Sequence, residues 1–165
     1  MAEALGAEAA LVSPHREAIR FRSEAEGYAA FVQAGGVDAY AAHVREVLAA
    51  QAVSFDLALG FSAGASALWL CLAEAAPWLP KRAELYYGSR IREHADLTPR
   101  CPTRLVFAER EASFDPAALA QRLRRRNLQA EIRPGSAHGF MNPLSPGFDA
   151  TLCATELARL QKLLA

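Results

Sequence analysis

Short apolar runs alternate with amphipathic helical segments along most of this chain, and this alternation limits the folds available to it. Strands separated by helices favour an α/β sheet whose strands run mostly parallel, because the helices serve as crossover connections. Right-handed crossovers then bring the loops at the carboxyl ends of the strands to one edge of the sheet. We therefore predict a mostly parallel sheet with helices on both faces, formed by residues 1–165 as a single domain.

Local sequence signals predict the boundaries of these elements. Apolar runs between turn residues indicate strands, and helical spacing with capping residues indicates helices. The predicted strands are Glu8–Val12, Val53–Gly60, Glu84–Tyr87, Thr103–Ala108 and Gln129–Arg133. The predicted helices run from the capping box of Ser23 and Glu26 to Gly35, over Val37–Gln51 and Ala63–Ala76, from the Asp115 N-cap to about Asn127, and from Ser145 to Leu164.

The charge balance and the cysteines argue against several classes of protein. Lys and Arg together number 18, as do Asp and Glu, so the formal net charge of +0 disfavours a nucleic-acid partner. No apolar run reaches the ~20 residues of a membrane helix, and the first residues lack the basic start of a signal peptide. The three cysteines are far apart and without CxxC spacing, which disfavours disulfides and a zinc site. We expect a cytoplasmic protein.

The segment Gly60-Phe61-Ser62-Ala63-Gly64 is a G-x-S-x-G motif at the point where a buried strand meets a helix. So tight a turn forces Ser62 into strained backbone angles and projects its side chain above the sheet. There the N–H of Ala63 and the positive end of the helix dipole would stabilise a developing oxyanion. The alternatives are a chance match and a phosphate-binding turn, and the lack of a further Gly-rich or Gly-Lys pattern weakens the second.

A reactive serine needs a histidine as its general base. Of the four histidines, His138 follows the Gln129–Arg133 strand in a loop of small residues, at the same edge of a parallel sheet as Ser62. His43 lies inside a predicted helix and His94 lies in a polar stretch. His15 follows a predicted strand and remains a second candidate. We predict that His138 is the base.

The base in turn needs an acid that orients its ring. Glu109, Glu111 and Asp115 follow the Thr103–Ala108 strand, and Glu111 is far enough past the strand to reach His138. Asp115 is the alternative acid, although its position before a proline is typical of a helix cap. The chain order of Ser62, Glu111 and His138 is nucleophile, acid, histidine, as in α/β-hydrolases.

Four segments together resemble the dienelactone hydrolase family of α/β-hydrolases. They are Leu59 to Gly64, Tyr86-Tyr87-Gly88, the stretch from Cys101-Pro102 to Glu111, and His138-Gly139-Phe140, and together they fall within residues 53–145. The resemblance implies an α/β-hydrolase fold, here lacking its first strands. It also implies Ser62 as nucleophile, Glu111 as acid and His138 as base.

The chain departs from that family at several positions. The founding enzymes of the family use a cysteine nucleophile and an aspartate, where this chain has Ser62 and Glu111. They also carry a carboxylate-binding arginine a few residues past the histidine, where this chain has Met141-Asn142-Pro143. These departures leave the family's own substrate open.

We expect Phe61 and Tyr87 to line a substrate pocket, and Arg16 to contact an anion near it. The missing early strand would leave one edge of the sheet exposed, so we also expect a homodimer that covers this edge.

Three functions are compatible with these residues. The first is a hydrolase that cleaves a small ester, lactone or thioester through an acyl-enzyme and needs no metal or organic cofactor. The alternative is a non-catalytic α/β-hydrolase-like module that binds a ligand. The third is an anion- or nucleotide-binding α/β domain that uses the turn from Gly60 to Gly64, and it is the weakest because it leaves Glu111 and His138 unexplained. The expected partner is a small-molecule substrate, not a nucleic acid or a membrane.

Overall fold

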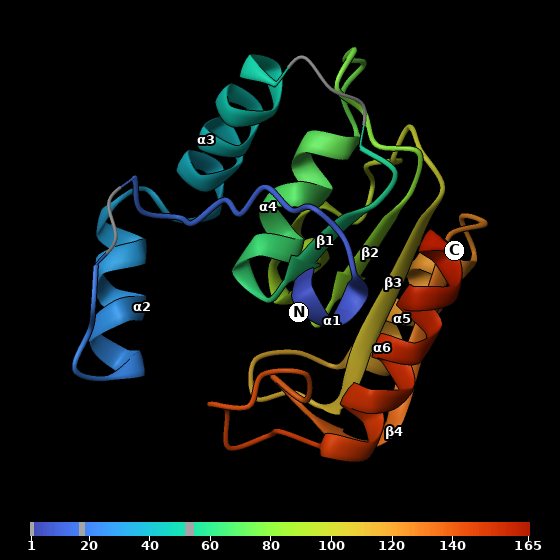
Figure 1. The fold of residues 1–165 in the computed structure, drawn as a ribbon. Helices are drawn as coiled ribbons and strands as arrows, with labels where there is room; N and C mark the ends of the chain where they lie inside the picture. The colour runs from blue at the N-terminus through green and yellow to red at the C-terminus, as the bar shows by residue number, and fades with distance from the viewer. Residues whose placement is uncertain (1, 17–18, 52–54) are drawn as a thin grey trace.

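The computed structural model describes residues 2–16, 19–51 and 55–165, and it centres on a four-stranded parallel sheet (Figure 1). The strands are β1 (Ala58–Phe61), β2 (Ala83–Tyr86), β3 (Thr103–Arg110) and β4 (Gln129–Ala137), in the spatial order β1-β2-β3-β4. Because all four strands run in the same direction, their carboxyl ends lie at one edge of the sheet. The prediction of a mostly parallel α/β sheet is confirmed.

Helices cover both faces of this sheet. They are α1 (Ala2–Leu5), α2 (Glu24–Gln33), α3 (Gly36–Ala50), α4 (Ala63–Leu72), the 3-10 helix η1 (Ser89–His94), α5 (Pro116–Arg124) and α6 (Ala150–Leu164). Leu85, Leu105 and Phe107 point to one face and pack with α3, α4 and α5 in the main apolar core. Their neighbours Tyr86 and Val106 point to the opposite face, because side chains alternate along a strand. That face carries α6, and α2 stands apart from the sheet (Figure 1).

Side chains cap two helices where the sequence predicts it. The Ser23 hydroxyl accepts a hydrogen bond of 3.2 Å from the N–H of Glu26 at the start of α2. The Asp115 carboxylate accepts bonds from two N–H groups in the first turn of α5, which begins with Pro116. Each bond satisfies an N–H that has no partner within its helix.

The start of the last helix differs from the prediction. Asp149, not Ser145, caps α6, and its carboxylate accepts hydrogen bonds of 3.0 Å from the N–H groups of Thr151 and Leu152. The Ser145 hydroxyl instead donates to the carbonyl of His138. Ser145 therefore fixes the loop between β4 and α6 rather than the helix.

The predicted strand at Glu8–Val12 is wrong, because residues 7–13 have no regular secondary structure and lie outside the sheet. The Val12 carbonyl accepts a hydrogen bond of 2.7 Å from the hydroxyl of Tyr40, and Leu11 is 96% exposed. The outer edge of β1 has no partner among the described residues, yet this segment does not pair with it. The hydrogen bond between Val12 and Tyr40 ties the segment to α3 instead.

Several element boundaries also shift. β1 begins at Ala58, later than the predicted start at Val53, which lies outside the described residues. α4 ends at Leu72, before the predicted end at Ala76, and α5 ends at Arg124. β3 and β4 extend past their predicted ends to Arg110 and Ala137. The extension brings the ends of β3 and β4 to the loops that carry the candidate site.

A buried cluster of charged side chains attaches α6 to the sheet. Arg104 on β3 lies 3.0 Å from both Glu84 on β2 and Glu156 on α6, and all three side chains are almost fully buried. Arg133 on β4 also pairs with Glu156. The Tyr86 hydroxyl donates a hydrogen bond of 3.0 Å to the Glu156 carboxylate. Charges in this position need such partners, because a lone buried charge is strongly destabilising.

No helix formed by residues 2–16, 19–51 and 55–165 combines the length and the apolar character that a bilayer crossing requires.

Candidate active site

Ser62 occupies a strained turn between β1 and α4. Its backbone angles are φ 51° and ψ −116°, in a region that residues other than glycine rarely adopt. The N–H of Ser62 donates to the carbonyl of Tyr86 at 2.9 Å, which anchors the turn to β2. A Cβ at Gly60 would lie 2.6 Å from the Cα of Ala65, so only glycine lets β1 and α4 approach this closely. The turn therefore holds the Ser62 side chain out at the carboxyl end of the sheet.

The structure brings His138 to Ser62 across 76 positions of sequence. The Ser62 Oγ lies 2.9 Å from Nε2 of His138, within hydrogen-bond reach. His138 directly follows β4, and its N–H donates to the carbonyl of Arg110 at the end of β3. Gly139 follows with φ 78°, a conformation that turns the chain away after the histidine.

Glu111 contacts the other nitrogen of the same ring. Its carboxylate oxygens lie 2.8 and 3.0 Å from Nδ1 of His138, and its side chain is only 3% exposed. A carboxylate only accepts hydrogen bonds, so Nδ1 carries a proton and Nε2 of the neutral ring faces Ser62 as an acceptor. This is the arrangement that lets a histidine take a proton from a hydroxyl.

The two other acids near this edge are engaged elsewhere. Asp115 caps α5, and Glu109 accepts a hydrogen bond of 2.8 Å from the N–H of Gly135. Of the three acids that follow the core of β3, the structure brings Glu111 to the histidine.

The first residue of α4 presents a free donor beside the serine. In the described part of the chain, no hydrogen bond is found to the N–H of Ala63, which follows Ser62 at the positive end of the helix dipole. An N–H in this position can donate to an oxygen that becomes negative next to Ser62. The geometry suits the oxyanion role predicted for Ala63.

Phe61 and Tyr87 lie beside the serine and the histidine. Phe61 stacks on Tyr86 with ring centroids 5.2 Å apart, and Tyr87 contacts the His138 ring edge-on at 5.0 Å. Tyr87 has φ 42°, and burial raises the pKa of its hydroxyl far above the ordinary value. The phenol therefore stays neutral, and Tyr87 serves as a wall of the site rather than as a proton acceptor.

A cavity of about 710 Å³ opens over the Ser62 hydroxyl. Phe61, Tyr87 and His138 line it together with Ser62. Phe21, Ser23, Gly139 and residues 141–145 of the loop after His138 complete the lining. Sequence reasoning missed this loop as a pocket wall, although its place directly after His138 was a usable signal.

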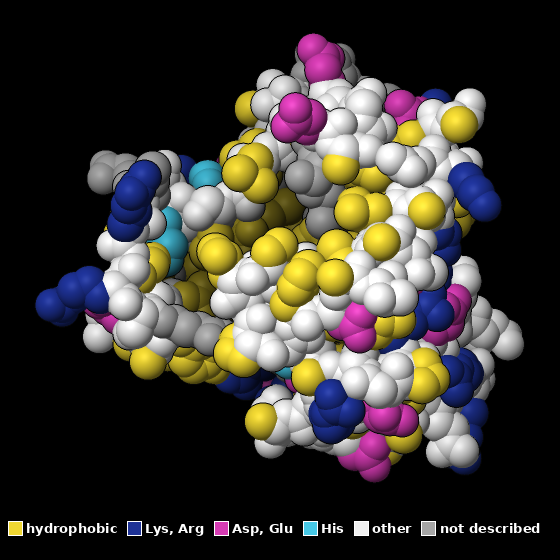
Figure 2. Space-filling model, turned by 60° about the horizontal axis from the view of Figure 1, so that its bottom comes forward, with side chains coloured by type: hydrophobic (Ala, Val, Ile, Leu, Met, Phe, Trp, Pro, Cys, Tyr) yellow, Lys and Arg dark blue, Asp and Glu magenta, His cyan; other side chains and the backbone are white. Residues whose placement is uncertain are grey.

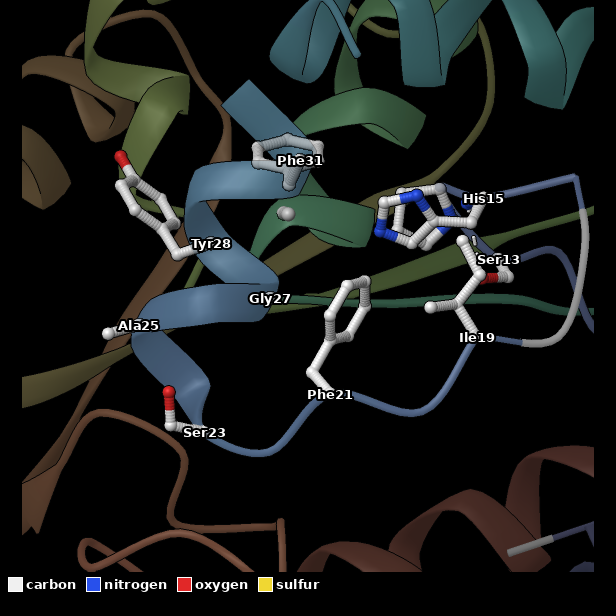
Figure 3. Close-up of a pocket in the computed structure, with 11 residues that line it drawn as sticks. Ser13, His15, Ile19, Phe21, Ser23, Ala25, Gly27, Tyr28 and Phe31 are labelled. Carbon is white, nitrogen blue, oxygen red and sulfur yellow. Dashed lines mark hydrogen bonds between the residues drawn. The ribbon is translucent and has the colours of Figure 1, made fainter. Parts of the chain in front are cut away.

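A second cavity, of about 850 Å³, has Ala63 among its lining residues. Figure 3 shows the side chains that line it. Phe21 and Ser23 line both cavities, so the two are neighbours. His15, Ile19 and Phe21 face one another in Figure 3, with the His15 and Phe21 rings 5.2 Å apart. Figure 2 shows a hollowed face of the molecule with hydrophobic side chains along its walls.

The structure does not bring Arg16 to the site, against the expectation. Its guanidinium pairs with Glu46 on α3 at 2.5 Å, and Arg16 lines neither cavity. Both side chains of this pair are more than half exposed, and an ion pair at the surface contributes little to stability. His15 lines the second cavity, and no hydrogen bond joins it to Ser62 in the described residues.

No group of three or more His, Cys, Asp or Glu side chains that could hold a metal ion is found in residues 2–16, 19–51 and 55–165.

Comparisons with known proteins found a similar curated sequence and a solved structure of similar fold. None of the protein-family models compared with the chain matches it. The chain is 36% identical over 113 residues to "Uncharacterized protein YczH" of Bacillus subtilis, a match that covers 66% of this chain and 54% of that protein. The chain thus spans about half the length of this curated relative.

The fold is also similar to a crystal structure from Klebsiella pneumoniae subsp. pneumoniae described as "Putative Dienelactone Hydrolase". The TM-score is 0.63 at 19% sequence identity, and the match covers 87% of this chain and 67% of the other. At this identity the similarity establishes a shared fold.

Proposed function

We propose that this chain carries the active site of a serine hydrolase that cleaves a small ester, lactone or thioester through an acyl-enzyme. The observation that carries the proposal is the contact of 2.9 Å between the Ser62 hydroxyl and His138, on a serine held in a strained turn. The similarity of the fold to a protein described as a dienelactone hydrolase supports it.

In the first half of the reaction, Ser62 becomes acylated. The Oγ forms a bond to the substrate carbonyl carbon while its proton passes to Nε2 of His138. The carbonyl oxygen becomes negative and accepts a hydrogen bond from the N–H of Ala63. The bond from the carbonyl carbon to the leaving group then breaks, and the leaving group takes the proton from Nε2.

In the second half, water releases the acyl group. His138 takes a proton from water, whose oxygen attacks the acyl carbon, and the proton then returns to Ser62 as the acid leaves. The imidazolium that forms in each half lies beside the buried carboxylate of Glu111, which stabilises the positive ring and holds its orientation. The products are the free acid and the alcohol or thiol; for a lactone, the acid and the alcohol are parts of one hydroxy acid.

Turnover of p-nitrophenyl acetate by the wild-type protein and by Ser62→Ala tests the proposal. We expect the substitution to lower kcat by at least ~10³, because the nucleophile is lost. Ser113→Ala is a matched control, since Ser113 is exposed and lines neither cavity. Equal rates for wild type and Ser62→Ala would remove the proposal.

Labelling by a fluorophosphonate separates this proposal from the non-catalytic binding module. We expect the probe to modify the wild-type protein at Ser62 and to leave Ser62→Ala unmodified. A wild-type protein that resists the probe would favour the binding module, because an unactivated serine does not react with it.

A further inference from the structure

A buried serine is hydrogen-bonded to the turn that carries Ser62. Ser66 is the fourth residue of α4 and is 2% exposed, and its Oγ donates a hydrogen bond of 3.2 Å to the Ser62 carbonyl. The backbone N–H of Ser66 donates to the same carbonyl at 3.1 Å. The Ser62 carbonyl oxygen therefore has two donors, one from the helix backbone and one from a buried side chain.

The Ser66 hydroxyl is itself held by a third segment of the chain. It accepts a hydrogen bond of 3.2 Å from the backbone N–H of Arg90 in η1, the helix that follows β2. A serine inside a helix often bonds back to the carbonyl four residues earlier. The bond from Arg90 distinguishes Ser66 from that ordinary case, because it occupies a lone pair of Oγ and leaves the proton to the Ser62 carbonyl.

The Ser62 carbonyl and the Ala63 N–H belong to one peptide unit. In a trans peptide the C=O and the N–H point in opposite directions, so donors that fix the carbonyl also fix the direction of the N–H. Hydrogen bonds in a chain polarise one another, so the same donors make the Ala63 N–H a stronger donor. This N–H has no acceptor within the described part of the chain, and it is the one predicted to bind the oxyanion.

The strained backbone of Ser62 needs such support. A residue other than glycine keeps a φ of 51° only where its surroundings hold it there. The Tyr86 carbonyl holds the Ser62 N–H at 2.9 Å on one side of the residue, and Ser66 holds the Ser62 carbonyl on the other. The Ser66 hydroxyl is thus part of what keeps the peptide after Ser62 in one orientation.

Resting on the proposed function, we propose that Ser66 is a positioning residue of the oxyanion hole, whose hydroxyl orients and polarises the peptide between Ser62 and Ala63. The chain of hydrogen bonds runs from the Arg90 N–H through the Ser66 hydroxyl to the Ser62 carbonyl. It continues through the peptide to the Ala63 N–H, which donates to the developing oxyanion. Ser66 itself lines neither cavity, so it acts through this peptide and not on the substrate.

The kinetics of Ser66→Ala test this role. We expect kcat and kcat/KM for p-nitrophenyl acetate to fall by the same factor, about 10-fold, because the weakened bond is made only to the transition state. The loss is smaller than the ~10² to 10³ of a deleted oxyanion donor, since the Ala63 N–H remains. A kcat equal to that of the wild type, or a change confined to KM, would overturn the proposal.

Ser66→Cys separates the hydrogen bond from packing. The thiol occupies the space of the hydroxyl but is a weak donor. We expect its kcat to stay near that of Ser66→Ala. A wild-type kcat in Ser66→Cys would mean that the hydroxyl only fills space, and the positioning role would be lost.

Ser136→Ala is a matched control for Ser66→Ala. Ser136 is also 2% exposed, and its hydroxyl donates to the Arg133 carbonyl at 2.7 Å and accepts from the Glu109 N–H at 3.3 Å. The two alanine variants should therefore lose similar stability in urea unfolding, whereas only Ser66→Ala should lose activity. An equal loss of kcat in both would point to general destabilisation and refute the assignment.

Nuclear magnetic resonance of the unliganded protein separates this inference from the proposed function. Loss of a hydrogen bond to the Ser62 carbonyl reduces the polarisation of the peptide, so the amide nitrogen resonance of Ala63 should move upfield in Ser66→Ala. Such a shift in a protein without esterase activity would support the control of this peptide by Ser66 although the proposed function had failed. An unmoved Ala63 resonance in an active esterase would overturn the role of Ser66 and leave the proposed function intact.

Discussion

Glu111 lies 2.8 Å from Nδ1 of His138 and is almost completely shielded from solvent by the protein around it. The pair joins the residue after β3 to the residue after β4, two adjacent parallel strands. Because the strands are hydrogen-bonded neighbours, the two loops have little freedom to separate. The pairing of β3 with β4 therefore helps to hold the His138 imidazole in its orientation toward Ser62.

Replacing Glu111 with Gln should inactivate the proposed enzyme while preserving its shape. The amide has no charge to stabilise the imidazolium, and its NH₂ group can reverse the tautomer of His138. We expect kcat for p-nitrophenyl acetate to fall by about 10⁴, as for a comparable change in other serine hydrolases.

Asp115→Ala is the matched control for Glu111→Gln. Asp115 caps α5, so its loss should lower the free energy of unfolding by about 1 kcal/mol and leave kcat unchanged. Urea unfolding and ester turnover measure the two effects. A large loss of kcat in Asp115→Ala, with Glu111→Gln active, would exchange the roles of the two acids.

The two glycines of the G-x-S-x-G motif, Gly60 and Gly64, should differ in how their replacement by alanine affects stability. A Cβ at Gly60 meets the backbone of Ala65 at 2.6 Å, whereas a Cβ at Gly64 meets the Tyr40 hydroxyl at an ordinary 3.4 Å. We expect Gly60→Ala to lower the free energy of unfolding by about 1–3 kcal/mol through steric overlap. Gly64→Ala should have no such cost. Urea denaturation of both variants checks the contrast, and equal stabilities would count against the close approach of β1 and α4.

Glu156 should be essential to the attachment of α6. It is 1% exposed and contacts Arg104, Arg133 and Tyr86, so a neutral Gln leaves two arginines without their shared carboxylate. We expect Glu156→Gln to lower the free energy of unfolding by about 3–5 kcal/mol. Glu131→Gln should have a smaller effect, because the Glu131 side chain is 34% exposed. The prediction fails if both variants unfold at the same urea concentration.

The same cluster should make the fold sensitive to acid. The hydrogen bonds from Arg104 lower the pKa of Glu131 to about 2, from an ordinary 4.5. Burial raises the pKa of Glu156, but Arg104 and Arg133 outweigh it and the net shift is downward. A carboxyl group with a depressed folded-state pKa stabilises the protein above its unfolded pKa and loses that contribution as the pH falls.

We therefore expect the free energy of unfolding to decline as the pH is lowered from 4.5 to about 2. Urea unfolding at a series of pH values measures the decline. In Glu131→Gln the decline should be shallower, because one of the titrating groups is gone. A wild-type stability that stays constant over this range would contradict the prediction.

The outer edge of β1 should favour association between copies of the chain. The N–H groups of Ala58 and Ser62 donate to the carbonyls of Arg82 and Tyr86, at the two ends of β2. The alternating positions Leu59 and Phe61 therefore direct their N–H groups away from β2. In the described residues no strand pairs with that edge, and unpaired edges attract other strands. We expect light scattering to report a homodimer at micromolar concentration. A monomeric mass there would contradict this prediction.

Local sequence signals were sufficient for most of the elements. The cap at Asp115 and the strand-to-helix turn at Ser62 depend on neighbours within a few positions, and the structure has both. Glu8–Val12 failed because strand formation depends on a distant backbone that can pair with it. Ser145 failed as a cap because α6 begins only at Ala150, and the Ser145 hydroxyl accepts its hydrogen bond from the N–H of Gly147 in the loop before it.

The buried cluster had a signal that sequence reasoning did not use. Glu84 and Arg104 are the only charged residues in the predicted strands Glu84–Tyr87 and Thr103–Ala108, and the parallel register places them opposite each other. A charge in a buried strand needs a partner, so each could have been predicted to seek one. The third member, Glu156, is indistinguishable in sequence from any helical glutamate.

The sequence alone determined the alternation of strands and helices, the turn at Ser62 and the order of the three polar residues, because each is encoded by local spacing. Only the tertiary structure decided that Glu111 rather than Asp115 meets His138, that Arg16 turns to Glu46, and that Phe21 separates two cavities. These outcomes depend on which side chains compete for one place in space, and that competition is settled by packing between segments far apart in the chain.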